Sequence, residues 1–143
     1  MFQRILIAWD GSEVALRAFD VAIDLTRRFE GELLAISIAH SPAHAETETD
    51  REESSEAARR YLEATFAEVR DRAERAGVGV AHEVLAGEDA AGALLDYAHE
   101  HGFDLLVCGH HHERRAGRLL LRGAAEALVR RSRVPVLVVT EPD

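Results

Sequence analysis

A histidine- and arginine-rich loop flanked by glycines is the stretch of this sequence whose residue types are best suited to binding an anion. The loop follows the apolar run Phe103–Cys108, begins at Gly109 and ends at Gly123, where a helical pattern starts. Its polar residues include His110, His111, His112, Arg114, Arg115, Arg118 and Arg122. Backbone N–H groups and the positive end of a following helix attract anions, and arginine forks bind phosphate through charge-assisted hydrogen bonds. The loop therefore predicts an anion site.

The histidines of the same loop raise the alternative of a metal site. His40 and His44 follow another apolar run, and Asp10 follows a third. If these runs are neighbouring strands, the outer two lie about 10 Å apart, and their polar residues reach one crevice with the histidines of the loop. Imidazoles and a carboxylate are good ligands for Zn²⁺ or Ni²⁺. Consecutive histidines cannot easily share one ion because their side chains diverge, so exposed loop residues are the simpler interpretation and a metal site on His40, His110 and His112 is the alternative.

Length and composition are those of a soluble protein with one domain. The 143 residues suit a single domain over 1–143, and 47% hydrophobic with 30% charged residues is ordinary for a globular chain. No apolar run is long enough to span a membrane, and no signal-peptide pattern precedes the first run. The lone cysteine, Cys108, fits a reducing compartment. We therefore expect a cytoplasmic protein without membrane association.

The charge distribution excludes some classes of function. A net charge of −9 argues against general nucleic-acid binding, although seven arginines gather between residues 110 and 133. All 17 basic residues are arginine, and this removes lysine-dependent chemistry such as Schiff-base formation and the P-loop. There is also no G-x-S-x-G elbow and no dinucleotide fingerprint. The sequence therefore contains no developed active site.

Five apolar runs alternate with four helical patterns. The expected strands are 4–9, 32–39, 78–85, 103–108 and 134–139. The expected helices begin after Ser12, at Ser54 or Ser55, after Asp89 and near Leu121, and Gly31, Gly77 and Gly102 end the first three. This order predicts a parallel α/β sheet with helices on both faces, in which ligands bind beyond the C-terminal strand ends where the strand order reverses.

Some side chains receive a more specific expectation. The run 78–85 alternates, so we expect a half-exposed edge strand there. We expect His82, His99 and His101 at the surface, and Val129 on the buried stripe of the last helix.

Three segments carry a family resemblance. Residues 5–13, Ile-Leu-Ile-Ala-Trp-Asp-Gly-Ser-Glu, resemble the opening strand and turn of the universal stress proteins. Residues 104–109 resemble their fourth strand, and residues 118–139 resemble their last helix and strand. The resemblance implies a three-layer, doubly wound sheet of five parallel strands in the order 3-2-1-4-5. It also implies a homodimer along the fifth strand, Val134–Val139, which would cover an apolar edge that is otherwise an aggregation hazard.

In one branch of that family the resemblance implies a site for ATP or AMP, with Mg²⁺ only as the partner of the nucleotide. That branch carries G-x2-G-x9-G-[S/T], and this loop departs from it. Gly109 matches the first glycine, His112 replaces the second, Gly123 matches the third one residue late, and Ala124 replaces the hydroxyl residue. The lost glycine allowed phosphate to approach the backbone, and the lost hydroxyl was a donor. The neighbouring arginines offer compensating charge.

The resemblance also assigns residues to the nucleotide site. They are Ala8, Trp9, Asp10, Ile38, Cys108, Gly109, His111, His112, Arg118, Arg122, Gly123, Ala124 and Ala125. Asp10 matches the acid that contacts the nucleoside, and capping the first helical turn explains it equally well. Ordinary core packing is the alternative for Ile38 and Cys108.

These observations favour a cytoplasmic stress-response protein that acts as a binding and regulatory module. In this interpretation the chain binds ATP or AMP through an altered loop. One alternative is a dimeric interaction protein that binds no nucleotide. Others are a weak ATP-hydrolysing enzyme, for which the sequence shows no general base, and a metal-binding protein that uses the histidine loop.

Overall fold

The computed structural model describes residues 1–39, 48–111 and 123–142, which form nine elements. They are β1 (Arg4–Ala8), α1 (Glu13–Phe29), β2 (Glu32–Ala39), α2 (Glu48–Arg75), β3 (Val80–Ala86), α3 (Ala90–Glu100), β4 (Leu105–His110), α4 (Ala124–Arg131) and β5 (Val136–Thr140). All four strand pairings are parallel, and the order is β3-β2-β1-β4-β5. The predicted α/β fold and its strand order are therefore confirmed.

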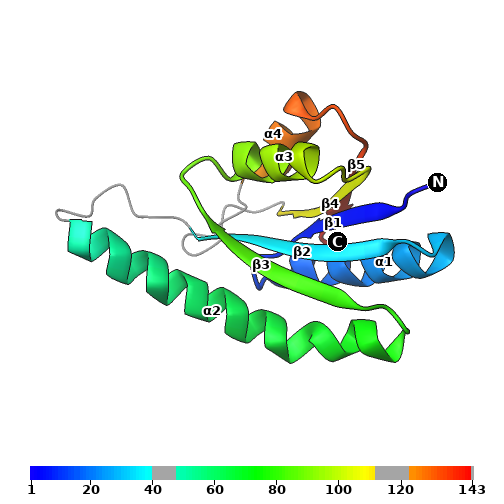
Figure 1. Cartoon of the computed structure of the whole chain (residues 1–143), viewed down its shortest axis with the longest axis horizontal. Helices are drawn as coiled ribbons and strands as arrows, with labels where there is room; N and C mark the ends of the chain where they lie inside the picture. Colours follow the sequence, from blue (N-terminus) through cyan, green and yellow to red (C-terminus); the bar gives the residue numbers. More distant parts are fainter. Residues whose placement is uncertain (40–47, 112–122, 143) are drawn as a thin grey trace.

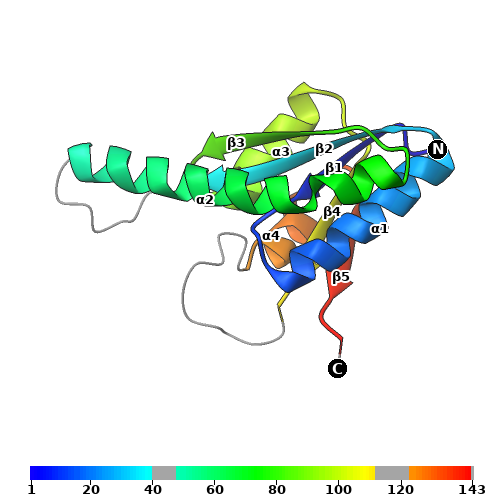
Figure 2. The same cartoon turned by 90° about the horizontal axis from the view of Figure 1, so that it is seen from below.

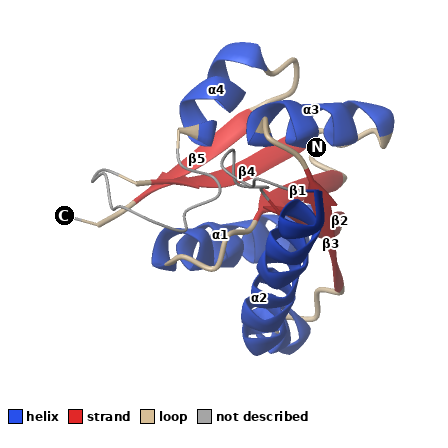
Figure 3. Cartoon of the chain, turned by 90° about the vertical axis from the view of Figure 1, so that its left-hand side faces the viewer, coloured by secondary structure: helices blue, strands red, loops and turns tan. Residues whose placement is uncertain are grey.

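The sheet lies between two layers of helices. Helices α1 and α2 cover one face, and α3 and α4 cover the other (Figures 1 and 3). Odd-numbered residues of β1 pack with Phe19 of α1 and Phe66 of α2, whereas Leu6 and Ala8 pack with Leu94 of α3 and Leu128 of α4. This division follows from the alternation of side chains along a strand. Two main cores, one on each face of the sheet, hold the three layers together, and a small third cluster joins α2 to β2 and β3 through Leu62, Ala39 and Val84.

The first helix begins as predicted but ends differently. Ser12 is the N-cap, and its Oγ accepts a hydrogen bond from the Ala15 N–H at 3.1 Å. The left-handed residue that ends the helix is Glu30, with φ of +53°, and not Gly31. A Cβ on Gly31 would lie 2.8 Å from the Gln3 carbonyl oxygen. Gly31 is therefore needed for the close approach of two backbones.

Helix α2 starts earlier than the sequence indicated. It begins at Glu48, so Ser54 and Ser55 lie inside it and do not cap it. Acidic residues such as Glu52 and Glu53 favour the early turns of a helix because they complement its dipole, and they extend the helix beyond the expected cap. The N-terminal part of α2 projects past the sheet (Figures 1 and 2).

In the described part of the chain, the two outer strands each pair with a single neighbour. Strand β3 is one edge of the sheet, as its alternating pattern predicted, and β5 is the other. Leu137 of β5 is 36% exposed, and Val129 of the neighbouring α4 is 58% exposed, so Val129 does not lie on the buried stripe as expected. The last helix is short and packs chiefly through Leu128 and the alanines of its first turn. No helix in the described part of the chain is long and apolar enough to cross a membrane.

Candidate functional site

The candidate site lies at the C-terminal ends of the two central strands. Strand β1 pairs with β2 on one side and with β4 on the other, so the connections leave the sheet in opposite directions at this point. Such a switch in strand order opens a crevice where α/β proteins bind ligands. Asp10 follows β1, and Gly109, His110 and His111 form the end of β4 and the residue after it. Strand β4 therefore continues past Gly109, where the sequence placed its end.

Asp10 is held by the turn that leads into α1. Its side chain is almost fully buried, and its Oδ1 accepts hydrogen bonds from Ser12 N at 2.9 Å and Ser12 Oγ at 2.5 Å. These bonds fix the carboxylate and leave Oδ2 without a hydrogen bond from any described residue. Asp10 therefore does not cap α1 itself, as the structural alternative predicted, but holds the residue that does, and its Oδ2 accepts no hydrogen bond from a described residue.

Trp9 reaches the site through its backbone alone. Its indole lies on the face of the sheet that α1 and α2 cover, against Phe19 and Phe66, and its Nε1–H donates to Thr65 Oγ1 at 3.1 Å. The Trp9 carbonyl accepts a hydrogen bond from Ser37 Oγ at 2.6 Å. The sequence assigned Trp9 to the nucleotide, and the structure places its side chain in the core between α1 and α2.

His82 contacts Ser37 as well and is half-buried, which corrects the expectation that it is a surface residue. Its ring stacks on Phe66 at 4.4 Å, and its Nε2 lies 2.8 Å from Ser37 Oγ. Burial, with a smaller contribution from Arg70, lowers the pKa of His82 to about 4. The sequence missed this because the alternation of β3 suggested exposure, whereas α2 covers this face of the strand.

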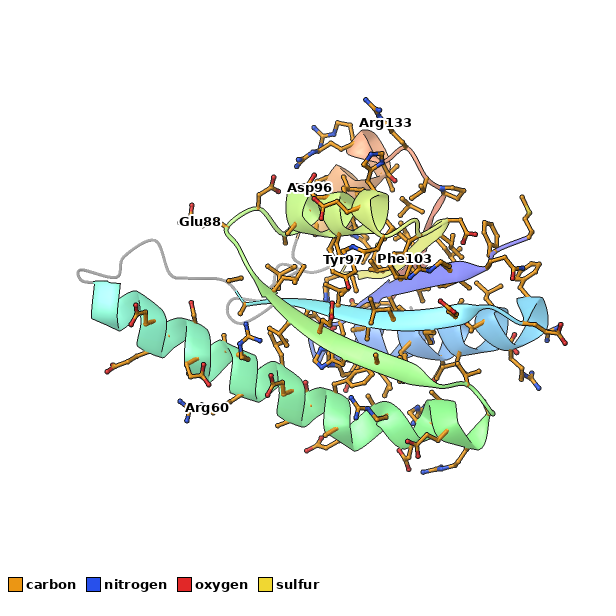
Figure 4. The ribbon with its side chains drawn as sticks, in the orientation of Figure 1. Arg60, Glu88, Asp96, Tyr97, Phe103 and Arg133 are labelled. Carbon is orange, nitrogen blue, oxygen red and sulfur yellow. The ribbon has the colours of Figure 1, made fainter. Side chains whose placement is uncertain are left out.

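His99 and His101 are exposed, as expected. His101 stacks on Tyr97 at 4.0 Å. Tyr97 and Phe103 are labelled in Figure 4 between α3 and the sheet.

Gly109 allows α1 to approach β4 closely. A Cβ on Gly109 would lie 2.9 Å from Val14 Cγ1 and 3.1 Å from the Val14 carbonyl carbon. The first turn of α1 therefore packs directly on the end of β4, and this contact sets the distance between the Asp10 turn and His111. The glycine that matched the family pattern thus has a packing role within the chain itself.

His111 lies between two carboxylates. Its Nε2 is 3.6 Å from Asp10 Oδ2, and its Nδ1 is 3.1 Å from Glu141 Oε1. The side chains of Asp10 and His111 are 1% and 9% exposed, and that of Glu141 is 28% exposed. Glu141 directly follows β5, and the pairing of His110 with Thr140 brings the next two residues side by side. Sequence reasoning placed His111 at the site and missed Glu141, since only the register of β4 and β5 links them.

Three other residues that the sequence assigned to the nucleotide site are apolar and buried. Ala8, Ile38 and Cys108 are each no more than 2% exposed and belong to one core cluster under α3 and α4. Burial raises the pKa of the Cys108 thiol to about 11, so the thiol stays protonated and behaves as a small apolar side chain. The structure places all three in the core, in keeping with the alternative given for Ile38 and Cys108.

The far end of the loop is described from Gly123 onward. Gly123 precedes α4 with φ of +74°, a left-handed conformation that favours glycine. Ala124 and Ala125 form the first turn of α4 and are buried. The predictions for His40, His44, His112, Arg114, Arg115, Arg118 and Arg122 fall outside the described residues.

The described residues include no group of three or more histidine, cysteine, aspartate or glutamate side chains arranged to hold a metal ion. Hollows occur elsewhere on the molecule. One of about 470 Å³ lies between α4 and β5 and is lined by residues that include His110, Val129 and Val138. Another of about 300 Å³ lies between α3 and the turn before β5, where Asp96 and Arg133 are labelled in Figure 4. Neither lining includes Asp10 or His111.

Comparisons with known proteins agree with this architecture. The model of the universal stress protein family matches residues 1–140. Universal stress protein MJ0531 from Methanocaldococcus jannaschii is 31% identical over 144 residues, which cover 99% of this chain and 84% of that protein. A solved structure from the universal stress protein family of Burkholderia pseudomallei is 26% identical, with a TM-score of 0.77 and 96% of both chains covered. A universal stress protein solved in complex with cAMP is 27% identical, with a TM-score of 0.72, and covers 96% of this chain and 97% of its own. The chain therefore belongs to the universal stress protein family.

Proposed function

We propose that this protein is a stress-response binding and regulatory module that takes an adenine nucleotide, ATP or AMP, at the ends of β1 and β4. The observation that carries the proposal is the meeting of Asp10 and His111 at the switch in strand order. Asp10 Oδ2 accepts no hydrogen bond from a described residue, so it can accept one from a nucleoside hydroxyl or amine. The relative solved with cAMP supports the choice of an adenine nucleotide.

The altered loop gives this site a particular character. The pattern of the nucleotide-binding branch is incomplete here, because His112 and Ala124 replace a glycine and a hydroxyl residue. We therefore expect phosphate recognition to depend on the charge of Arg118 and Arg122 and less on close backbone contacts. Mg²⁺ would enter only with a triphosphate, since the described residues supply no three-ligand metal group.

Isothermal titration calorimetry with AMP and ATP tests the proposal. We expect binding in the micromolar range, a loss of about tenfold for Asp10→Ala because one charged acceptor is removed, and a loss for Arg118→Ala/Arg122→Ala that is larger for ATP than for AMP. Glu100→Ala, an exposed residue at the end of α3, is the matched control. Absence of both heat and thermal shift with each nucleotide would contradict the proposal and favour a nucleotide-independent interaction protein.

We also propose that two chains associate through β5 into a homodimer. Leu137 of the edge strand β5 and Val129 of α4 expose apolar surface, and Val129 and Val138 line a hollow of about 470 Å³. A second copy of the same edge would cover this surface. Sedimentation equilibrium should give twice the chain mass for the wild type and the chain mass for Leu137→Asp. Tyr61→Asp, at a 43% exposed position on α2, should leave the mass unchanged, and a wild-type monomer at micromolar concentration would refute the dimer.

A further inference from the structure

Glu141 contacts a residue of the candidate site from just beyond the segment that the family model matches, residues 1–140. It follows the edge strand β5, yet its Oε1 lies 3.1 Å from His111 Nδ1. The register of β4 and β5 holds the two residues side by side, because His110 pairs with Thr140 and Gly109 with Val139. The register therefore places the two backbones side by side, and the side-chain rotamers bring Nδ1 to Oε1.

The two distances at His111 distinguish its two nitrogens. A neutral imidazole carries one N–H, and the other nitrogen is an acceptor. The 3.1 Å separation from Nδ1 to Glu141 Oε1 is within hydrogen-bond range, whereas the 3.6 Å from Nε2 to Asp10 Oδ2 is too long. In the neutral imidazole the proton therefore belongs on Nδ1, which donates to Glu141, and the lone pair of Nε2 faces Asp10. A carboxylate partner selects the tautomer of a functional histidine in the same way at many protein sites.

In this tautomer, His111 Nε2 and Asp10 Oδ2 are two neighbouring hydrogen-bond acceptors at the end of the sheet. Asp10 Oδ1 is occupied by two donors from Ser12, so Oδ2 is the oxygen that faces Nε2. Two acceptors 3.6 Å apart, on side chains that are 1% and 9% exposed, repel each other unless a donor group enters between them. A ligand with two adjacent donors, such as the vicinal hydroxyls of a ribose, matches this pair.

We propose that Glu141 is a positioning residue that holds His111 as an acceptor, so that His111 Nε2 and Asp10 Oδ2 together recognise a ligand carrying paired hydrogen-bond donors. The inference rests on the proposed nucleotide function and adds to it a second recognition residue, its tautomer and the residue that sets it. If Glu141 is lost, the proton can move to Nε2 and bond to Asp10, which blocks the acceptor pair. Glu141→Gln keeps an oxygen acceptor for Nδ1–H, and Glu141→Ala does not.

The first test is calorimetry with AMP and with 2′,3′-dideoxyadenosine monophosphate. The wild type should bind AMP more tightly than the dideoxy analogue. Glu141→Ala should bind AMP about tenfold more weakly than the wild type, equivalent to about 1.4 kcal/mol, and it should discriminate less between AMP and the dideoxy analogue. Glu141→Gln should stay within about twofold of the wild type. Glu126→Ala, which removes the same charge from the first turn of α4, is the matched control.

The second test reads the tautomer without a nucleotide. Long-range ¹H–¹⁵N spectra of His111, recorded at a pH at which the spectra themselves show a neutral ring, should show Nδ1–H in the wild type and in Glu141→Gln, and Nε2–H in Glu141→Ala. The same spectra report whether each variant is folded. The inference would be overturned if the wild type carried the proton on Nε2. It would also be overturned if Glu141→Ala matched Glu126→Ala both in AMP affinity and in its preference for AMP over the dideoxy analogue. Failure of the wild type to bind any adenine nucleotide would refute the proposed function and, with it, the recognition role of the pair.

Discussion

Replacing Gly109 with alanine tests whether the contact between α1 and β4 sets the geometry of the site. The new Cβ would lie 2.9 Å from Val14 Cγ1 and 3.1 Å from both Val14 Cγ2 and the Val14 carbonyl carbon. The Val14 side chain can rotate away, but the carbonyl carbon moves only with the helix. The first turn of α1, which carries the Asp10–Ser12 hydrogen bonds, must therefore shift.

Such overpacking typically costs about 1–3 kcal/mol. For a chain of 143 residues this corresponds to a fall in Tm of about 3–10 °C. Gly79→Ala is the matched control, because a Cβ there meets nothing within 4 Å and the backbone φ is not positive. We expect Gly79→Ala to be neutral or to gain up to about 1 kcal/mol through the unfolded state.

Urea unfolding and thermal melting of the two variants measure the difference. Adding Val14→Ala to Gly109→Ala removes the two methyl contacts and leaves the carbonyl contact, so we expect partial recovery of stability. Equal midpoints for Gly109→Ala and Gly79→Ala would refute the reasoning, because they would show that the close approach of α1 is not constrained by this glycine.

Three further predictions concern the packing behind the site. The pKa of His82 is lowered to about 4 in the folded chain and is about 6.5 in the unfolded chain, so the free energy of unfolding should decline as the pH falls from about 6.5 towards 4. His82→Gln should flatten this decline in urea titrations at several pH values, and a pH profile identical to that of the wild type would contradict the lowered pKa of His82. Thr65→Val leaves the Trp9 Nε1–H without its acceptor and should cost about 1–3 kcal/mol in chemical denaturation, whereas Thr65→Ser should cost much less if the hydroxyl matters. Asp89→Ala removes the N-cap hydrogen bond from the Gly92 N–H at 3.1 Å and should lower the free energy of unfolding by about 1 kcal/mol. Asp89→Ser should retain most of that stability, because the exposed ion pair with Arg131 contributes little. A serine variant as unstable as the alanine variant would assign the effect to the ion pair instead.

The local sequence pattern was sufficient to predict the helices and strands and their order along the chain. Apolar runs of strand length alternating with amphipathic helices predicted five parallel strands between two helical layers, and Ser12 and Asp89 mark helix starts as expected. These features depend on residues within a few positions of each other, which a single sequence displays. The family resemblance assigned Asp10 and His111 to one site, and the structure brings His111 Nε2 to 3.6 Å from Asp10 Oδ2.

Features that depend on contacts between distant segments were not available to that reading. The partial burial of His82 requires α2 to lie across β3, and the need for glycine at position 31 comes from its close approach to the Gln3 carbonyl. The role of Glu141 depends on the alignment of β4 with β5 across 30 residues of sequence.

The sequence by itself therefore determined the fold, the family resemblance and the edge of the sheet where a ligand would bind, because each is encoded in short-range periodicity and in motif residues. The tertiary structure alone decided which atoms of that edge face each other. Strand register and the close packing of α1 on Gly109 place the side chains of Asp10, His111 and Glu141 within contact distance, and neither quantity is written in the local pattern of any one segment.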